Sequence, residues 1–175
     1  MTSAETGIVL IGPPGAGKSS VGSLLADSLG VPFADTDALV ELTAGKPVGD
    51  IFVEDGEPVF REYERAAVAR ALEVVAANGT RGVVALGSGA VLDPDVRRML
   101  AGWLVVHLEA GFATVARRTG MDAPRVVIPG NPRGRLRAML EERQPAYAQL
   151  ASVAISTDGM AAEEVAADLA KRLAS

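Results

Sequence analysis

Short apolar runs alternate with longer amphipathic stretches along this chain of 175 residues. The apolar runs have the length of β-strands and lie at positions 8–11, 32–34, 83–86, 104–108 and 153–155. Between them, hydrophobic side chains recur at helical spacing over positions 17–29, 38–43, 58–77, 94–101, 112–118, 132–149 and 161–173. Such alternation is typical of a parallel sheet with helices on both faces. The pattern therefore predicts an α/β fold, a three-layer α/β/α sandwich around a five-stranded parallel sheet.

A single domain accounts for the whole length, 1–175. Hydrophobic residues make up 49% of the chain, enough for one sizeable core, and no repeat, linker or low-complexity tract divides it. The stretch 119–132 is rich in Gly, Pro and Arg and lacks apolar periodicity, so we expect a mobile loop there. Its position before a long helix suits a lid that closes over a ligand.

A glycine-rich motif follows the first apolar run directly. Positions 12–19 read GPPGAGKS, which fits G-x-x-x-x-G-K-[ST], the phosphate-binding P-loop. The glycines let consecutive backbone N–H groups curl around a polyphosphate, Lys18 can reach the outer phosphates, and the Ser19 hydroxyl can ligate Mg²⁺. A helix that begins near Gly17 would also point its positive end at the phosphates. The motif predicts nucleoside triphosphate binding.

The charge balance of the chain is acidic, with one basic region. The formal net charge is −5 and the sequence pI is about 4.9, which argues against a general nucleic-acid surface. The segment 117–143 nevertheless holds seven arginines against three acidic residues, a local balance of +4. This segment is where we expect phosphate and an anionic substrate to meet.

Several kinds of site are excluded by the residues that the chain lacks. There is no cysteine, so neither a disulfide framework nor a thiolate metal site can form. Positions 1–6 carry no basic region, and the apolar run after them is too short for a signal peptide or a membrane span, so we expect a cytoplasmic protein that does not bind membranes. His107, the one histidine, lies in an apolar run and is expected to be structural.

Polar residues follow the strands at the points where ligands bind in parallel sheets. After the second run come Asp35 and Asp37, which on an extended segment would point to opposite faces. One carboxylate could then hold Mg²⁺ near Ser19 and the other could accept the proton of a reacting hydroxyl. The alternative is that one of the two aspartates, with Asp37 as the one considered in particular, caps a helix beginning near position 38.

Two arginines from distant segments are candidates for binding an organic acid. Arg61 and Glu64 lie three positions apart on a predicted helix, and taken alone this is more simply an exposed ion pair. Arg143, near the end of another helix, could join Arg61 as a clamp, because the planar guanidinium suits a carboxylate. Phe52 and Phe60 could form an apolar pocket wall or could simply belong to the core.

Residues 87–89, Gly-Ser-Gly, follow the third strand. Such a turn lets backbone N–H groups approach a ligand closely, although a plain turn is equally consistent.

Taken together, the motifs of this chain resemble the shikimate kinase family, a nucleoside monophosphate kinase-like branch of P-loop proteins. The resemblance covers almost the entire chain and rests on segments 12–19, 33–37, 49–52, 55–61, 86–91, 117–119 and 143–147.

The resemblance implies transfer of the ATP γ-phosphoryl group to the 3-hydroxyl of shikimate, with ATP and Mg²⁺ bound by one monomer. Lys18 would stabilise the transferring group, Ser19 would bind Mg²⁺ with support from Asp35, and Asp37 would orient or deprotonate the attacking hydroxyl. The shikimate pocket, within a region of about 37–64 and beyond, would comprise Asp37, Phe52, Phe60, Arg61, Gly87, Ser88, Gly89 and Arg143.

The resemblance also assigns the nucleotide-binding residues. Arg118 would pack on the adenine, and Arg125 would be a catalytic lid arginine that moves toward the phosphates. The remaining nucleotide contacts would come from Gly15, Ala16, Gly17, Lys18, Ser19 and Ser20.

Three segments depart from the family pattern. Ser88 stands where three glycines are usual, Val126 follows Pro124 and Arg125 where the lid usually reads Arg-Pro-Leu, and positions 157–160 lack the usual arginines of the adenine loop. These departures motivate one alternative, a non-catalytic nucleotide-binding module that has lost turnover. A second alternative is a kinase for another small hydroxy acid, against which the paired arginines argue.

Overall fold

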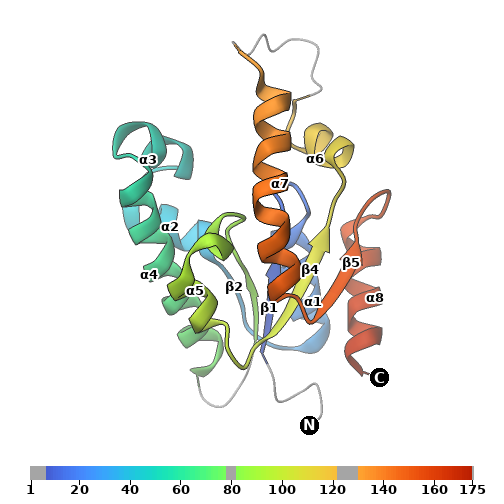
Figure 1. Ribbon diagram of the computed structural model, residues 1–175. Helices are drawn as coiled ribbons and strands as arrows, with labels where there is room; N and C mark the ends of the chain where they lie inside the picture. The colour runs from blue at the N-terminus through green and yellow to red at the C-terminus, as the bar shows by residue number, and fades with distance from the viewer. Residues whose placement is uncertain (1–6, 78–81, 122–129, 175) are drawn as a thin grey trace.

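The central sheet has five strands, all parallel, in the order β2-β3-β1-β4-β5 (Figure 1). The computed structural model describes residues 7–77, 82–121 and 130–174. The strands are β1 (Ile8–Ile11), β2 (Phe33–Asp35), β3 (Val83–Ala85), β4 (Leu104–Glu109) and β5 (Val153–Ser156). The predicted five-stranded parallel sheet is confirmed.

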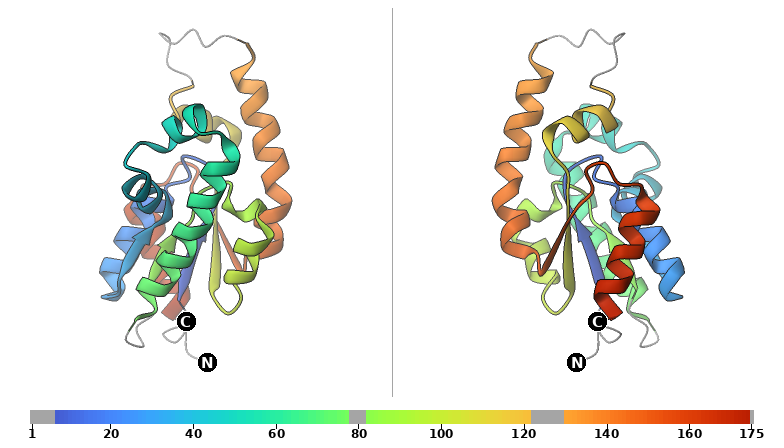
Figure 2. Two further views of the ribbon diagram at one scale, coloured as in Figure 1. Left: turned by 90° about the vertical axis from the view of Figure 1, so that its left-hand side faces the viewer. Right: turned by 90° about the vertical axis from the view of Figure 1, so that its right-hand side faces the viewer.

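Helices connect the strands and cover both faces of the sheet (Figure 2). They are α1 (Lys18–Leu29), α2 (Thr36–Ala44), α3 (Val48–Glu54), α4 (Glu57–Val75), η3, a 3₁₀ turn (Ala90–Leu92), α5 (Pro94–Met99), α6 (Phe112–Arg118), α7 (Pro132–Leu150) and α8 (Ala162–Ala174). No helix within the described ranges is long and apolar enough to cross a membrane.

Two hydrophobic clusters hold the three layers together. On one face, Val9 and Ile11 of β1 pack with residues of α4, α5 and α7. On the other face, Ile8 and Leu10 pack with residues of α1 and α8. Because side chains of successive strand residues point to opposite faces, β1 is apolar throughout and fully buried.

A smaller lobe of α2, α3 and the start of α4 stands beside the sheet. Its own core contains Val40, Ile51 and Phe60. The sequence pattern did not predict α3, because this seven-residue helix buries only Ile51 and so carries no amphipathic repeat. Pro47 precedes it and Gly56 follows it, so the chain around α3 reads as a loop.

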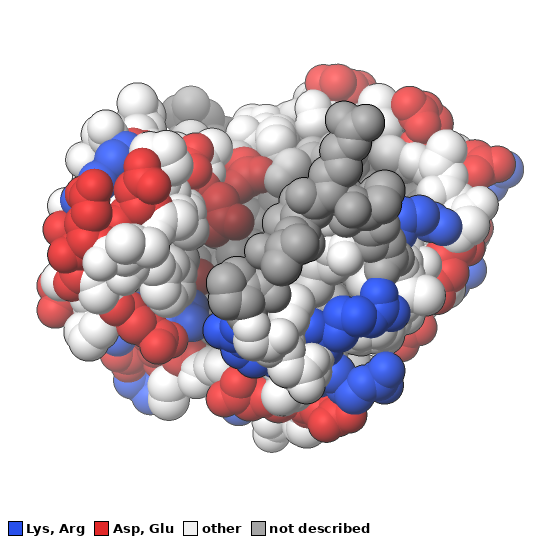
Figure 3. Space-filling view, turned by 90° about the horizontal axis from the view of Figure 1, so that it is seen from above, with Lys and Arg blue, Asp and Glu red and all other residues white. Residues whose placement is uncertain are grey.

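The carboxyl ends of all five strands meet at one edge of the sheet. The register pairs Asp35 of β2 with Ala85 of β3, and Ile11 of β1 with His107 of β4. The P-loop, the residues after Asp35 and the turn 87–89 therefore lie side by side. In the view from above, a hollow separates the acidic lobe from the rest of this edge (Figure 3).

Candidate active site

The P-loop connects β1 to α1 in a conformation that requires its glycines. Gly15 and Gly17 have positive φ angles of 72° and 92°. Gly12 has a φ of 148°, and a Cβ there would lie 2.4 Å from the carbonyl oxygen of Leu108. A side chain at these positions would strain the backbone or clash, so the loop can approach a ligand closely only as a glycine-rich segment.

Lys18 lies in the first turn of α1, and its ammonium group folds back onto the loop. Its Nζ donates to the carbonyl oxygens of Gly12 and Pro13, each at 2.9 Å, and to Ser88 Oγ at 3.1 Å. Burial lowers the pKa of Lys18 from 10.5 to about 8, against the opposing effect of the Asp37 and Asp35 carboxylates. The lysine is a charged, partly buried group at the centre of the site.

Asp35 ends β2 and has two roles in the local structure. Its Oδ2 accepts the hydroxyl proton of Ser19, and its Oδ1 accepts from the backbone N–H groups of Asp37 at 2.9 Å and Ala38 at 3.3 Å. Asp35 is thus the N-cap of α2, a position that Asp favours. The expectation that one of the two aspartates caps this helix is confirmed, but the cap is Asp35 and not Asp37.

Asp37 lies in the first turn of α2 and shares one cavity with the P-loop. The cavity has a volume of about 320 Å³ and is lined by Pro14, Gly15, Gly17, Lys18, Ser19, Ser20, Asp35, Asp37, Ala85, Leu86 and Ser88. Burial raises the pKa of Asp37, with a further rise from Asp35 and an opposing effect of Lys18. The two aspartates therefore line the same cavity in different environments. The expectation that they point to opposite faces was wrong, because residues two apart on an extended segment share a face and because Asp37 lies in α2.

Arg61 and Arg143 converge on the turn 87–89, as the clamp hypothesis requires. A Cβ at Gly89 would lie 2.7 and 2.9 Å from the two terminal nitrogens of Arg61 and 3.2 Å from Nη2 of Arg143. The buried Nε of Arg143 has no hydrogen-bond partner among the described residues. Because an unpaired buried donor is costly, a bound carboxylate near these guanidinium groups would be favoured.

Glu64 is a functional candidate that the sequence indicated only as the exposed partner of Arg61. It accepts from Arg61 Nη1 at 2.7 Å, and its side chain is only 2% exposed, so the expectation of an exposed surface pair was wrong. Glu57, on the exposed side, accepts from Arg61 Nη2 at 3.1 Å. Burial raises the pKa of Glu64, and Arg61 opposes that rise. The helical period of α4, which buries Phe60, Glu64 and Ala67 on one face, is the signal that would have shown its burial.

The two phenylalanines lie together beside Arg61. Their ring centroids are 4.3 Å apart, and the Arg61 guanidinium lies 5.2 Å from the Phe60 ring and 6.0 Å from the Phe52 ring. Phe60 is buried in the lobe, whereas Phe52 is 38% exposed. Phe60 therefore belongs to the core and Phe52 is the ring that a ligand can reach.

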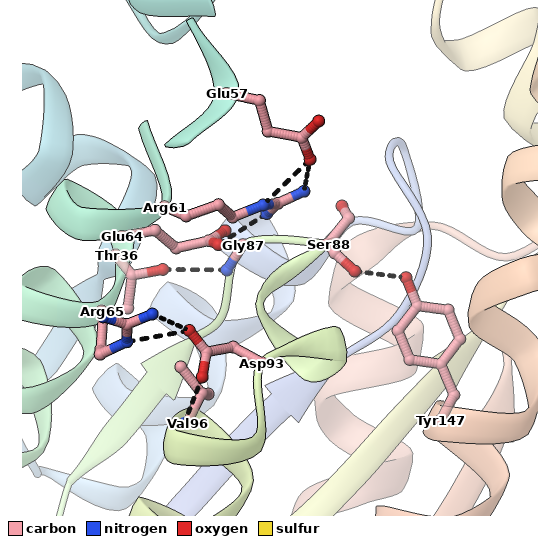
Figure 4. A network of polar contacts seen from close by, with 10 residues as sticks. All are labelled: Thr36, Glu57, Arg61, Glu64, Arg65, Gly87, Ser88, Asp93, Val96 and Tyr147. Carbon is pink, nitrogen blue, oxygen red and sulfur yellow. Dashed lines mark hydrogen bonds and ion pairs between the residues drawn. The ribbon is translucent and has the colours of Figure 1, made fainter. Parts of the chain in front are cut away.

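Buried hydrogen bonds hold the turn 87–89 in place (Figure 4). Thr36 Oγ1 accepts from the N–H of Gly87 at 2.9 Å, and Tyr147 Oη donates to the carbonyl oxygen of Ser88 at 2.7 Å. Both side chains are buried, at 0% and 1% exposure. Neither residue was singled out from the sequence, because Thr and Tyr in helices carry no spacing signal for such contacts.

Gly87 is required by the carboxylates around it. A Cβ there would lie 2.8 Å from Asp37 Oδ1 and 2.8 Å from Glu64 Oε1. Glycine at this position allows both carboxylates to approach the backbone of the turn.

A second cavity lies on the other side of the P-loop. Arg118 Nη1 donates to the carbonyl oxygen of Gly15 at 3.0 Å and to Thr157 Oγ1 at 3.1 Å, and Nη2 donates to the carbonyl oxygen of Thr157 at 2.9 Å. The cavity, of about 270 Å³, is lined by Gly15, Ala16, Gly17, Ser20, Val21, Arg118, Thr157, Met160, Ala162 and Val165. Its mixed apolar and polar walls could take a heterocyclic base.

The remaining sequence predictions fall outside the two cavities. His107 is 3% exposed within β4 and stacks on Tyr147 with ring centroids 4.9 Å apart, so it occupies a structural position. Arg125 and most of the predicted lid, 119–132, lie outside the described residues.

A metal ion would have few protein ligands here. The described residues contain no group of three or more His, Cys, Asp or Glu side chains that could hold a metal. Ser19 and Asp35 together offer a hydroxyl and a carboxylate, which fits Mg²⁺ bound mainly through water and phosphate oxygens.

Comparison with known proteins identifies the family to which this chain belongs. The family model described as shikimate kinase matches residues 14–174. The shikimate kinase of Thermobifida fusca is 53% identical over 94% of this chain and 93% of its own, and that of Salinispora tropica is 47% identical over 95% and 97%. The structure of an Acinetobacter baumannii shikimate kinase in complex with shikimate superposes with a TM-score of 0.84 at 31% identity, covering 98% of this chain and 94% of that chain.

A gluconokinase from Sinorhizobium meliloti superposes less closely, with a TM-score of 0.63 at 24% identity over 97% of this chain and 96% of its own. This likeness shows a shared fold alone. The family model and the relatives of similar length together show that the chain belongs to the shikimate kinase family and is an ATP-dependent small-molecule kinase.

Proposed function

We propose that this shikimate kinase transfers the γ-phosphoryl group of ATP to the 3-hydroxyl of shikimate. The observation that carries the proposal is that Lys18, Asp37 and Ser88 line one cavity next to the guanidinium groups of Arg61 and Arg143. Phosphoryl transfer needs mainly positioning and charge neutralisation, and this arrangement provides both.

Shikimate would bind between the lobe and the turn 87–89. Arg61 and Arg143 would hold its carboxylate with charge-assisted hydrogen bonds, and backbone groups of the turn would contact the ring substituents. Phe52 would cover one face of the ring, and Phe60 would support it from the core. The region of about 37–64 would then be the substrate-binding part of a single domain.

Asp37 would accept a hydrogen bond from the reacting hydroxyl and take its proton. Its raised pKa makes it a stronger base than an ordinary carboxylate. Lys18, already held at the P-loop, would neutralise charge on the transferring group.

Ser19 and Asp35 would hold Mg²⁺, the serine directly and the aspartate through water. When bound, the ion neutralises the charge that develops on the phosphate oxygens. The Ser19–Asp35 contact supports this assignment, because it places both oxygen donors next to the P-loop.

The adenine would occupy the second cavity. Arg118 would lie along the base while its hydrogen bonds to Gly15 and Thr157 keep it in place. The roles of the lid and of Arg125 stay predictions from the sequence. We also propose, as expected from the sequence, a monomer that works in the cytoplasm.

The direct test is a coupled assay of ADP release with Mg²⁺ and ATP, using shikimate, quinate and gluconate as acceptors beside an acceptor-free blank. We expect strong turnover with shikimate only and loss of turnover when EDTA removes Mg²⁺. A protein that binds ATP but turns over none of the acceptors would favour the non-catalytic module instead.

The arginine clamp can be tested separately. Arg61→Lys and Arg143→Lys keep the charge but remove the planar fork, so the KM for shikimate should rise about tenfold or more in each. Arg70→Lys is the matched control, because Arg70 is an exposed residue of the same helix and pairs there with Glu73. An unchanged KM for shikimate in both clamp variants would refute this role.

A further inference from the structure

Ser88 is the one polar side chain on the turn 87–89, and it faces the P-loop. Its Oγ accepts from Lys18 Nζ at 3.1 Å, and its side chain lines the same cavity as Lys18 and Asp37. The hydroxyl therefore links the turn beside the two arginines to the lysine that serves the phosphates.

The backbone of this turn is held from two sides, whereas the hydroxyl is not. Gly87 N–H is bound by Thr36, and the Ser88 carbonyl oxygen is bound by Tyr147 (Figure 4). Rotation about one side-chain torsion moves Oγ without disturbing either hydrogen bond. The contact with Lys18 can therefore break while the turn keeps its shape.

The donors of Lys18 are all in use in this structure. An ammonium group has three N–H donors, and its three acceptors here are the carbonyl oxygens of Gly12 and Pro13 and the hydroxyl of Ser88. A phosphate oxygen needs at least one of these donors. The two carbonyls belong to the loop that itself wraps the phosphate, so the Ser88 hydroxyl is the acceptor that can be displaced at least cost.

We propose that Ser88 is a positioning residue that holds the Lys18 ammonium while the nucleotide site is empty and releases it when phosphate binds. The proposal rests on ATP binding at the P-loop, as argued above. Its consequence is that ATP must break the hydrogen bond between Lys18 and Ser88 when it binds, which lowers its net affinity.

Three charged side chains interact electrostatically with Lys18, namely Asp35, Asp37 and Arg143. The charge of Lys18 also acts on His107. A change at Ser88 leaves all four in place. Differences between Ser88 variants therefore report on the hydroxyl itself.

The test is the dissociation constant of Mg²⁺-ATP, measured by calorimetry without shikimate, together with kcat and both KM values. Ser88→Ala and Ser88→Gly remove the acceptor from the empty enzyme only, so we expect ATP to bind about two- to tenfold more tightly, the range for one hydrogen bond. Ser88→Thr keeps the hydroxyl and should bind ATP like the wild type.

Ser28→Ala is the matched control, because Ser28 Oγ donates to the Leu25 carbonyl within α1. Unchanged or weaker ATP binding in Ser88→Ala would overturn the proposal, and so would a raised KM for shikimate with unchanged ATP affinity. A wild-type protein that binds no ATP would refute the proposed function as well. Melting temperatures identify any variant whose effect comes from misfolding.

Discussion

Lys18 and Asp37 carry opposite charges into one cavity, and burial disfavours the charged form of each. The pKa of Lys18 falls to about 8 and that of Asp37 rises. Both groups therefore lie nearer to neutral pH in their titration than a free lysine or aspartate. Each attracts the other, and this attraction opposes both shifts.

The alkaline limb of the pH profile should come from Lys18. Its pKa is lowered, so the ammonium is present below pH about 8 and is lost as pH rises through that value. We expect kcat/KM for ATP to fall above pH about 8, because this parameter reports groups of the free enzyme. Lys18→Arg should abolish this limb. A flat profile well above that pH in the wild type would contradict the assignment.

Asp37→Asn tests the proton acceptor. An amide cannot take the hydroxyl proton, so we expect kcat to fall by about 10²- to 10⁴-fold with ATP affinity retained. In the wild type, protonation of Asp37 on lowering the pH should produce an acid limb in the pH profile, which the raised pKa of this group shifts to higher pH. This limb should disappear in Asp37→Asn. Asp27→Asn, at an exposed position of α1, is the control. Full activity in Asp37→Asn would exclude Asp37 as the base.

At the scale of elements, the loop after β5 supports the P-loop although the two are far apart in sequence. Arg118 at the end of α6 bonds both Gly15 and Thr157, and Thr157 Oγ1 in turn donates to the Glu109 carbonyl at the end of β4. Thr157 is 2% exposed. The second cavity is therefore held open by hydrogen bonds that connect three strand ends.

Thr157→Val removes this hydroxyl while keeping the shape of the side chain. We expect the KM for ATP to rise by about two- to tenfold, since one hydrogen bond that orients Arg118 is lost, with kcat little changed. Thr43→Val is the control, because Thr43 is exposed and its Oγ1 donates to the Leu39 carbonyl within α2. A kcat that falls while the KM for ATP stays constant would rule out this supporting role.

The elements that the sequence predicted are those with a strong local signal. The strand β1 is a continuous apolar run and α4 repeats its apolar positions over 19 residues, so both were found. The single buried residue of α3 gave no repeat, and the cap of α2 was assigned to the wrong aspartate because both residues suit it. Thr36, Tyr147 and the burial of Glu64 were missed because they depend on how α2, α4 and α7 pack around one turn.

At the scale of the whole molecule, the sheet and the lobe each supply half of the site. The P-loop and Arg118 stand on the sheet, whereas Arg61 and Phe52 belong to the lobe. Seen from above, acidic side chains dominate the lobe, and Lys and Arg side chains gather on the opposite side of the hollow (Figure 3). Ligands that bridge the two parts should stabilise the folded chain as a unit.

Thermal unfolding measures this linkage. A ligand at one hundred times its Kd adds about 2.7 kcal/mol to the free energy of unfolding, which raises Tm by about 5–10 °C for a domain of this size. We expect Mg²⁺-ATP and shikimate each to produce such a rise in the wild type. Lys18→Met should fold, lose turnover and lose the rise with ATP while keeping that with shikimate. An equal ATP-induced rise in this variant would show that Lys18 does not hold the phosphates.

The two cavities share Gly15, Gly17 and Ser20 in their walls, so they adjoin across the P-loop without an intervening layer of side chains. For inhibitor design, this adjacency means that a single compound can span both compartments. Such a compound would place an aromatic group in one cavity, an anionic linker along the loop and a carboxylated ring in the other. Because the three groups are linked, the entropy of association is lost once and not separately for each group. Ser88, whose side chain lines the first of these cavities, would offer such a compound a hydroxyl to bind.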